Sequence, residues 1–171
     1  HGLGVGLTTL ELDAAGPEDM SVRTGPFAFA QAQRAQNAAL VEHVMRWADG
    51  DRGRIGLELF AGAGNFTRGL SRKVSELLAV ETDARAVIGL QQIAARIGVM
   101  GGVKVVVARE PAAATLSRAA AANQRFDLVL LDPPRAGLGV SAARDLARVA
   151  RGRTIYVACD PATMVRDLAV L

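Results

Sequence analysis

The sequence contains little cysteine and little histidine, and both shortages narrow the possible functions. A single cysteine, Cys159, excludes an internal disulfide and a metal site built from several cysteines. His1 and His43 are too few and too isolated to build such a site, so we expect no bound metal. Cys159 is therefore the one thiol whose position needs an explanation.

Long hydrophobic runs are also missing. Apolar residues make up 50% of the 171 residues, but they occur in short runs interrupted by Arg, Asp or Gly. We therefore expect no membrane span and no signal peptide, and one domain of the soluble globular class in the cytoplasm. The net charge of +3 comes mainly from scattered arginines. It permits a polyanionic partner without demonstrating one.

Short apolar strands alternate with helical patterns along most of the chain. We expect strands at residues 55–60, 76–81, 103–108, 127–131 and 154–158, and helices at residues 28–48, 65–72, 84–97, 112–122, 141–150 and 162–171. Continuous apolar strands separated by helices predict a doubly wound α/β fold, with a parallel sheet covered on both faces. Residues 1–27 are expected to form an extended segment before a domain at residues 28–171. In the first helix, His43 reads as solvated and Trp47 as packed in the core.

A glycine-rich turn follows the first strand, in Leu-Glu-Leu-Phe-Ala-Gly-Ala-Gly-Asn-Phe-Thr at residues 57–67. Ligands of parallel sheets bind outside the carboxyl ends of the strands, and Gly62 and Gly64 remove the Cβ atoms that would keep a ligand away. A dinucleotide fingerprint needs a third glycine where this chain has Thr67, which disfavours nicotinamide and flavin cofactors. S-adenosylmethionine (SAM) has no pyrophosphate and fits better. A tight strand-to-helix connection without a ligand is the alternative interpretation.

Carboxylates follow the second and third strands. Glu81 closes the second strand about twenty residues after the glycine turn, where a carboxylate can accept hydrogen bonds from both ribose hydroxyls of a nucleoside cofactor. A surface glutamate ahead of the next helix is the alternative. After the third strand, Arg109 cannot accept a hydrogen bond from an adenine amine, whereas Glu110 can. The adenine contact stays open at this point.

The fourth and fifth strands are followed by Asp132-Pro133-Pro134-Arg135 and by Cys159. Two prolines fix the backbone and present the Asp132 carboxylate rigidly. An aromatic residue in the fourth position would suit amino-group methyltransferases, whereas Arg135 suits a phosphate or carboxylate. A thiol just before a helix feels the positive end of that helix, which favours the thiolate. Asp160 opposes this if its carboxylate points the same way, and a buried inert cysteine is the alternative.

Three segments together resemble the RNA uracil-5 methyltransferases, SAM-dependent enzymes that make 5-methyluridine in tRNA and rRNA. They are residues 57–67, Asp-Pro-Pro-Arg-Ala-Gly at 132–137, and Cys-Asp-Pro-Ala-Thr at 159–163. The resemblance extends from about Phe29 to the end of the chain and implies a Rossmann-like class I methyltransferase domain. It implies Cys159 as the nucleophile and an RNA substrate near Asp132 and Arg135. The implied SAM site, with the two turn glycines added, consists of Gln31, Phe60, Gly62, Gly64, Asn65, Glu81 and Asp132.

The chain also departs from the pattern of this family. Gln33 and Asp160 each stand where the family has asparagine. The family's general base is a glutamate beyond the cysteine, and its sheet has two further strands, neither of which this chain reaches. The resemblance therefore implies a chain that is inactive alone, with residues 154–158 as an exposed apolar edge. The alternatives are a non-catalytic SAM- or RNA-binding fragment or degenerate relative, and an amino-group methyltransferase of nucleic acid.

Overall fold

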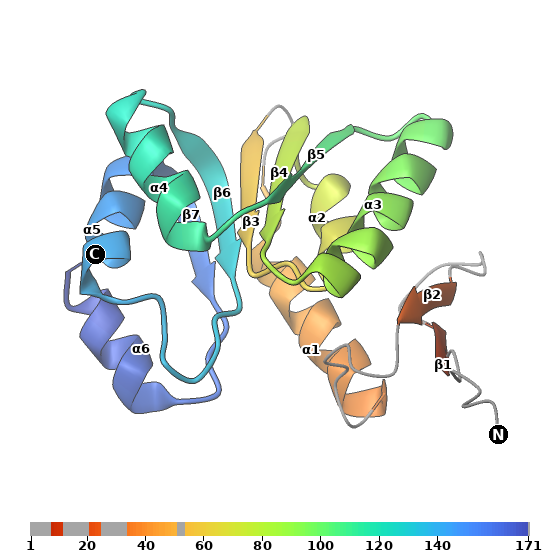
Figure 1. Cartoon of the computed structure of the whole chain (residues 1–171), viewed down its shortest axis with the longest axis horizontal. Helices are drawn as coiled ribbons and strands as arrows, with labels where there is room; N and C mark the ends of the chain where they lie inside the picture. Colours follow the sequence, from red (N-terminus) through yellow and green to blue (C-terminus); the bar gives the residue numbers. More distant parts are fainter. Residues whose placement is uncertain (1–7, 12–20, 25–33, 51–53, 171) are drawn as a thin grey trace, which may run out of the picture.

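The structure, a computed structural model, describes residues 8–11, 21–24, 34–50 and 54–170 (Figure 1). The strands in these residues are β1 (Thr8–Glu11), β2 (Ser21–Thr24), β3 (Ile55–Leu59), β4 (Glu76–Glu81), β5 (Lys104–Arg109), β6 (Phe126–Leu131) and β7 (Ala150–Tyr156). The helices are α1 (Arg34–Trp47), α2 (Thr67–Ser71), α3 (Ala84–Val99), α4 (Ala112–Ala121), α5 (Val140–Val149) and α6 (Pro161–Leu168). The alternation expected from residue 55 onward is confirmed.

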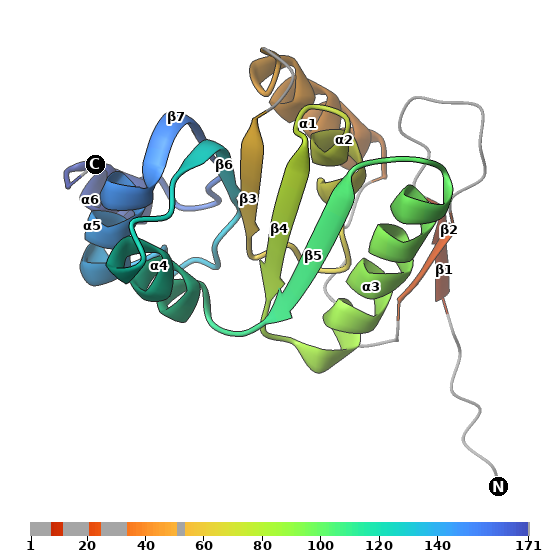
Figure 2. The ribbon, with the colours of Figure 1, turned by 90° about the horizontal axis from the view of Figure 1, so that it is seen from above.

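The central sheet is parallel and has the strand order β5-β4-β3-β6-β7, which Figure 2 shows side by side. Its first strand in the chain, β3, pairs with β4 on one side and with β6 on the other, so that Leu59 lies opposite both Val80 and Leu131. The chain leaves β3 toward one edge of the sheet and later returns to fill the other. This reversal of strand order is where doubly wound proteins bind ligands, at the carboxyl ends of the strands.

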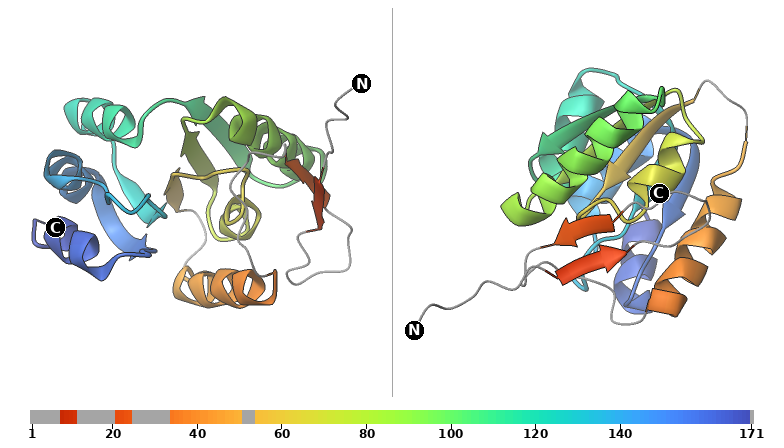
Figure 3. Two further views of the ribbon diagram at one scale, coloured as in Figure 1. Left: turned by 60° about the horizontal axis from the view of Figure 1, so that its bottom comes forward. Right: turned by 90° about the vertical axis from the view of Figure 1, so that its right-hand side faces the viewer.

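Helices cover both faces of the sheet, as Figure 3 shows. On one face Leu57 and Leu59 of β3 are buried with side chains of α4 and α5. On the other face Leu128 and Leu130 of β6 are buried with side chains of α1 and α2, and α3 packs over β4 and β5. Strands buried on both faces need continuous apolar runs, which is why the sequence pattern predicted them.

The last strand differs from the prediction. It covers Ala150–Tyr156 and begins directly after α5, whereas the sequence predicted residues 154–158. It lies at the edge of the sheet, as expected for residues 154–158, but its added first half carries the exposed Arg151 and Arg153. The pairing of β6 and β7 is irregular between Phe126 and Leu128, and a Cβ on Gly152 would lie 2.2 Å from the carbonyl oxygen of Asp127. An edge strand tolerates charges and a bulge that a central strand does not.

The amino-terminal part was predicted less well. Trp47 is 57% exposed, so its predicted place in the core is wrong. Its ring instead lies 4.7 Å from that of His43, which is exposed as expected. Residues 8–11 and 21–24 form an antiparallel pair beside α3, while the domain boundary at residues 27 and 28 stays a prediction. Within the described residues, every helix falls short of the length and apolar character needed to cross a membrane.

Candidate active site

The turn after β3 is held in an unusual backbone conformation. Phe60 has a φ of +60°, a costly value for a bulky side chain, and Gly62 follows with a φ of +58°. A Cβ on Gly64 would lie 2.6 Å from Cδ1 of Ile93, so this glycine allows α3 to pack closely. A Cβ on Gly62 would meet no atom within 4 Å. The two glycines therefore differ in role, because Gly62 faces open space that a ligand could fill.

Glu81 lies at the end of β4 and its carboxylate faces this turn. Its Oε2 accepts a hydrogen bond of 2.8 Å from the backbone N–H of Gly62. Its Oε1 accepts bonds of 2.6 and 2.8 Å from the backbone N–H groups of Thr82 and Asp83. The Thr82 hydroxyl also donates to Oε1, at 3.3 Å, so the lone pair that remains for a ligand is on Oε2. The side chain is half-buried beside the open space at Gly62, as a ribose-binding carboxylate must be.

Asn65 is tied to α1 by a reciprocal pair of amide hydrogen bonds. Asn37 Nδ2 donates to Asn65 Oδ1 at 2.9 Å, and Asn65 Nδ2 donates to Asn37 Oδ1 at 3.0 Å. Asn37 had no signal in the sequence, since an asparagine on a helix normally faces solvent. The role of Asn65 in cofactor binding stays a prediction. Gln31, another predicted contact, lies outside the described residues.

Glu58 is a residue of this region that the sequence analysis missed. It lies within the apolar β3 and is 0% exposed. Its Oε2 accepts a 2.6 Å hydrogen bond from the hydroxyl of Thr67, also buried, while Oε1 has no partner among the described residues. The pKa of Glu58 is raised to about 8. Burial is the main cause, the nearby charges of Asp132 and Glu81 add to it, and the bond from Thr67 opposes it. An acidic residue inside an apolar strand was the available signal.

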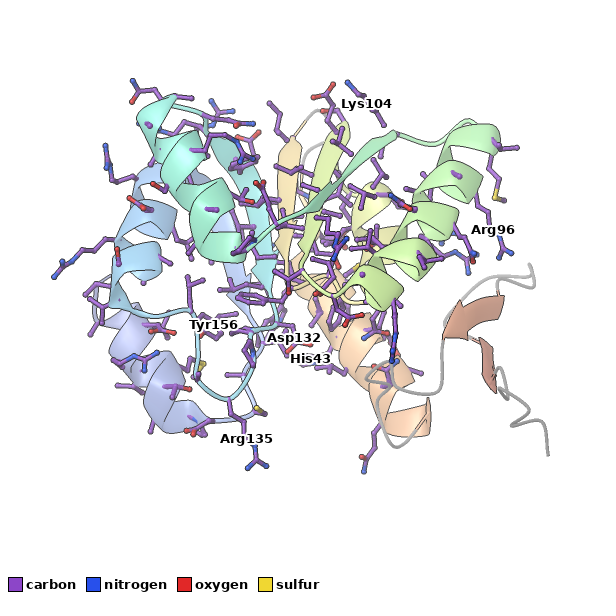
Figure 4. All side chains as sticks on the ribbon, viewed as in Figure 1. His43, Arg96, Lys104, Asp132, Arg135 and Tyr156 are labelled. Carbon is purple, nitrogen blue, oxygen red and sulfur yellow. The ribbon has the colours of Figure 1, made fainter. Side chains whose placement is uncertain are left out.

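Asp132 follows β6 on the other side of β3. Its backbone N–H donates a 3.4 Å hydrogen bond to the carbonyl oxygen of Leu59, which fixes the start of its segment beside the glycine turn. Its side chain is half-buried, and this burial raises the pKa of the carboxyl to about 6. Figure 4 shows Asp132 near the centre of this sheet end, far from Lys104 at the opposite end, with Arg135 extending outward from the following loop. Arg135 is exposed.

Cys159 is an exposed free thiol in the connection between β7 and α6. It comes three residues after the end of β7 rather than directly after it, because the strand begins and ends earlier than predicted. The alternative of a buried inert cysteine is therefore wrong. Asp160 is the N-cap of α6, and its carboxylate accepts a 2.9 Å bond from the N–H of Ala162. The carboxylate is thereby engaged with the helix end.

The carboxylate of Glu110, after β5, is engaged by side chains of α4. Both carboxylate oxygens of Glu110 accept bonds from Arg118, at 2.6 and 2.5 Å, and one also accepts from Thr115 at 2.7 Å. The bonds from Arg118, with that from Thr115, lower the pKa of Glu110 to about 2. Glu110 is thus directed at α4. Across the described residues, no group of three or more His, Cys, Asp or Glu is arranged to hold a metal ion.

Comparison with known proteins shows which family the chain resembles. Residues 11–171 match the family described as tRNA (Uracil-5-)-methyltransferase. The chain belongs to this family. The resemblance of the three sequence segments is therefore confirmed, and so is the α/β fold that it implied.

Two curated relatives illustrate how much of the family this chain represents. It is 36% identical over 146 residues to a 23S rRNA (uracil(1939)-C(5))-methyltransferase of Dechloromonas aromatica, covering 85% of this chain and 33% of the relative. It is 32% identical over 146 residues to an uncharacterized RNA methyltransferase of Thermotoga maritima, covering 85% of this chain and 32% of the relative. The chain thus spans about a third of the length of these family members.

Solved structures agree with this assignment. The tRNA (uracil-54, C5)-methyltransferase of Pyrococcus abyssi, crystallised in complex with S-adenosyl-L-homocysteine, superposes with a TM-score of 0.70 at 26% identity, over 96% of this chain and 38% of that one. The 16S rRNA N2 G1207 methyltransferase of Thermus thermophilus has a TM-score of 0.61 at 22% identity, over 88% of this chain and 41% of that one. The second likeness reflects the fold alone.

Proposed function

We propose that this chain binds SAM and carries the nucleophile of an RNA uracil-5 methyltransferase, which methylates C5 of a uridine in tRNA or rRNA. One observation carries the proposal. Glu81 ends β4, and Asp132 and Cys159 follow β6 and β7, so all three lie at the end of the parallel sheet where the glycine turn follows β3. We further propose that the protein acts in the cytoplasm, on RNA reached through other parts of a longer protein.

The residues of the turn fit the proposed cofactor. Glu81 would accept a hydrogen bond from a ribose hydroxyl with the lone pair that Oε2 keeps beside its bond from the Gly62 N–H. The open space at Gly62 would admit the methionine part next to the backbone. The remaining proposed contacts are Gln31, Phe60, Gly64, Asn65 and Asp132. Bound SAM supplies an electrophilic methyl group.

Cys159 supplies what uracil lacks, because C5 is a poor nucleophile until a group adds to C6. The Cys159 thiolate would form an S–C6 bond, and the electron pair of the C5–C6 double bond would move through C4 onto O4. C5 of this enolate would then take the methyl group of SAM, whose bond to sulfur breaks and leaves S-adenosyl-L-homocysteine. A base must finally remove the C5 proton, so that the S–C6 bond breaks and the thiolate leaves. Asp132 and Arg135 would contact the uracil and the RNA backbone.

The final proton transfer has no evident base in the described part of the chain beyond Cys159. No glutamate follows Cys159 in this sequence. Asp160 caps α6, and Asp167 is fully buried. We therefore expect this chain to add to C6 and transfer the methyl group, with negligible turnover on ordinary uridine.

SAM binding is tested most directly at Glu81. We expect Glu81→Ala to weaken the Kd for SAM at least about tenfold, because charge-assisted hydrogen bonds are worth about 1.5–3 kcal/mol. Isothermal titration calorimetry measures this. Glu81→Gln keeps an acceptor for Gly62 and should lose less. Glu76→Ala, an exposed glutamate at the other end of β4, is the matched control.

Other outcomes would favour other functions. Unchanged SAM affinity in Glu81→Ala, or no binding by the wild-type chain, would remove the cofactor assignment. SAM binding without any reaction at uridine would favour a non-catalytic binding fragment. Methylation of a base amino group would favour an amino-group methyltransferase of nucleic acid, although Arg135 offers no aromatic ring for stacking on such a base.

A further inference from the structure

A buried carboxylate outside the proposed site connects two of its loops. Asp167 lies near the end of α6 and is 0% exposed. Its oxygens accept bonds from the N–H of Leu138 at 2.6 Å and of Gly139 at 3.2 Å. They also accept from the hydroxyl of Tyr156 at 2.8 Å and from Arg166 at 2.7 Å. A helix residue therefore holds the loop that continues the Asp132 segment.

The attachment extends along the whole flank of α6. Arg166 donates a 2.8 Å bond to the carbonyl oxygen of Ala136, next to Arg135. Gly137, with a φ of +75°, approaches so closely that a Cβ there would lie 2.5 Å from Asp167 Oδ2 and 3.2 Å from Cβ of Thr163. Thr163 in turn donates a 3.1 Å bond to the carbonyl oxygen of Asp160. The loop and the first turn of α6 thus share contacts.

Charge supports the same picture. Burial alone would raise the pKa of Asp167, but bonds from Arg166, Tyr156 and the Leu138 N–H outweigh it and hold the pKa below its usual range. Burial, with the neighbouring Asp167, raises the pKa of Tyr156 to about 12, so its hydroxyl remains a donor at neutral pH. A buried carboxylate with this many donors is costly to disturb, since any lost partner leaves a buried polar group unpaired.

We infer that Asp167 is a positioning residue, which fastens residues 132–139 to α6 so that Asp132, Arg135 and Cys159 meet the uridine as one unit. The inference rests on the proposed function, because it concerns how the proposed nucleophile and substrate contacts are aligned. Asp167 acts through the loop and the helix and does not touch substrate. Small displacements matter in such an alignment, since a misplacement of about 1 Å can cost about 10²-fold in rate.

The kinetic test uses the covalent adduct with RNA that contains 5-fluorouridine. In Asp167→Asn, the rate of adduct formation at saturating RNA and SAM should fall at least about tenfold, and by more than the Kd for SAM rises, because Asp132 is only one of several proposed SAM contacts. Asp127→Asn is the matched control. Asp127 also accepts a backbone N–H, that of Ile55, and a guanidinium, that of Arg151, but at the far end of β6. This control should lose stability and keep its adduct rate.

Amide hydrogen exchange tests the coupling without RNA or cofactor. Asp167→Asn should speed exchange at Leu138 and Gly139, which it contacts, and also at Ala162, which it does not. If Asp167→Asn fails to fold, Tyr156→Phe replaces it in the test. Tyr156→Phe removes only one of the donors to Asp167 and should increase exchange at the same amides by a smaller amount. Asp127→Asn should leave all three amides unchanged.

The two arms separate two kinds of failure. If the wild-type chain forms no adduct, the proposed function fails, and the exchange measurement still decides the coupling. If exchange at Leu138 rises while exchange at Ala162 does not, the loop and the helix are independent and the inference is overturned. It is also overturned if Asp167→Asn and Asp127→Asn slow adduct formation equally.

Discussion

Cys159→Ala is expected to abolish the covalent adduct that we expect the wild-type chain to form with SAM and RNA containing 5-fluorouridine. Fluorine at C5 cannot be removed as a proton is, so the sequence of addition and methyl transfer stops at a stable S–C6 bond. The trap needs no general base, because the base acts only after the methyl group has moved. We expect a loss of at least about 10³-fold in adduct yield, measured by mass spectrometry of the intact protein.

The interpretation of this experiment depends on folding and on binding being unchanged. Cys159 is exposed, so its replacement by alanine removes no buried packing and should leave the unfolding midpoint and the Kd for SAM unchanged. Cys159→Ser, which keeps the shape of the side chain, should fail in the same way because a serine hydroxyl is not ionised at neutral pH. An adduct that survives in Cys159→Ala would contradict the assignment of Cys159 as the nucleophile. The assignment would also be contradicted if the wild-type chain formed no adduct at saturating RNA.

Glu58→Gln is expected to stabilise the protein at alkaline pH. The pKa of Glu58 is raised from 4.5 to about 8, so between these values the unfolded state is ionised while the folded state stays protonated. The unfolded state then binds fewer protons, and the free energy of unfolding falls as the pH rises through this window. Glutamine removes this dependence. We expect a gain of about 1–3 kcal/mol at pH 8 and little change at pH 4.5.

Urea unfolding of both proteins at the two pH values measures this effect. Glutamine retains an oxygen that can accept the hydroxyl proton of Thr67, so the packing of β3 against α2 is conserved. Glu110→Gln is a control whose stability change should have the opposite sign. The pKa of Glu110 is lowered to about 2, so the folded state is stabilised by the ionised carboxylate that glutamine removes. Equal stability changes for Glu58→Gln at both pH values would contradict a protonated Glu58.

The sequence predicted the parts of this fold that have a local signal. Continuous apolar strands, the glycine turn and the carboxylate at Glu81 each follow from residue type and spacing. Asp83 likewise starts α3 as a side-chain cap, accepting from the N–H groups of Arg85 and Ala86. The order of the strands has no local signal, but parallel pairing and the reversal at β3 follow from the alternation of strands and helices.

What the sequence did not predict depends on partners distant in the chain. Asn37 and Asn65 find each other across 28 positions, and Asp167 reaches Leu138 across 29. Asn37 and Asp167 each resemble a solvated helix residue when read alone. Trp47 misled for the converse reason, since a large apolar ring at a helical spacing predicts burial, yet the buried positions here are Val44 and Ala48. The charged start of β7, residues 151–153, has no apolar run and falls outside the predicted strand.

The bulge in β7 restricts what can pair with the outer edge of the sheet. Along Ala150–Tyr156 the backbone groups that face away from β6 form a template for another strand. In the first half of β7, Gly152 is pressed against the carbonyl of Asp127, and Arg153 turns to donate to the carbonyl oxygens of Trp47 and Asp49. Regular pairing is therefore possible only near Thr154 to Tyr156. A strand that pairs there has its register set from the end of β7 nearest Cys159. The edge therefore favours a strand in one register over unspecific pairing with other chains.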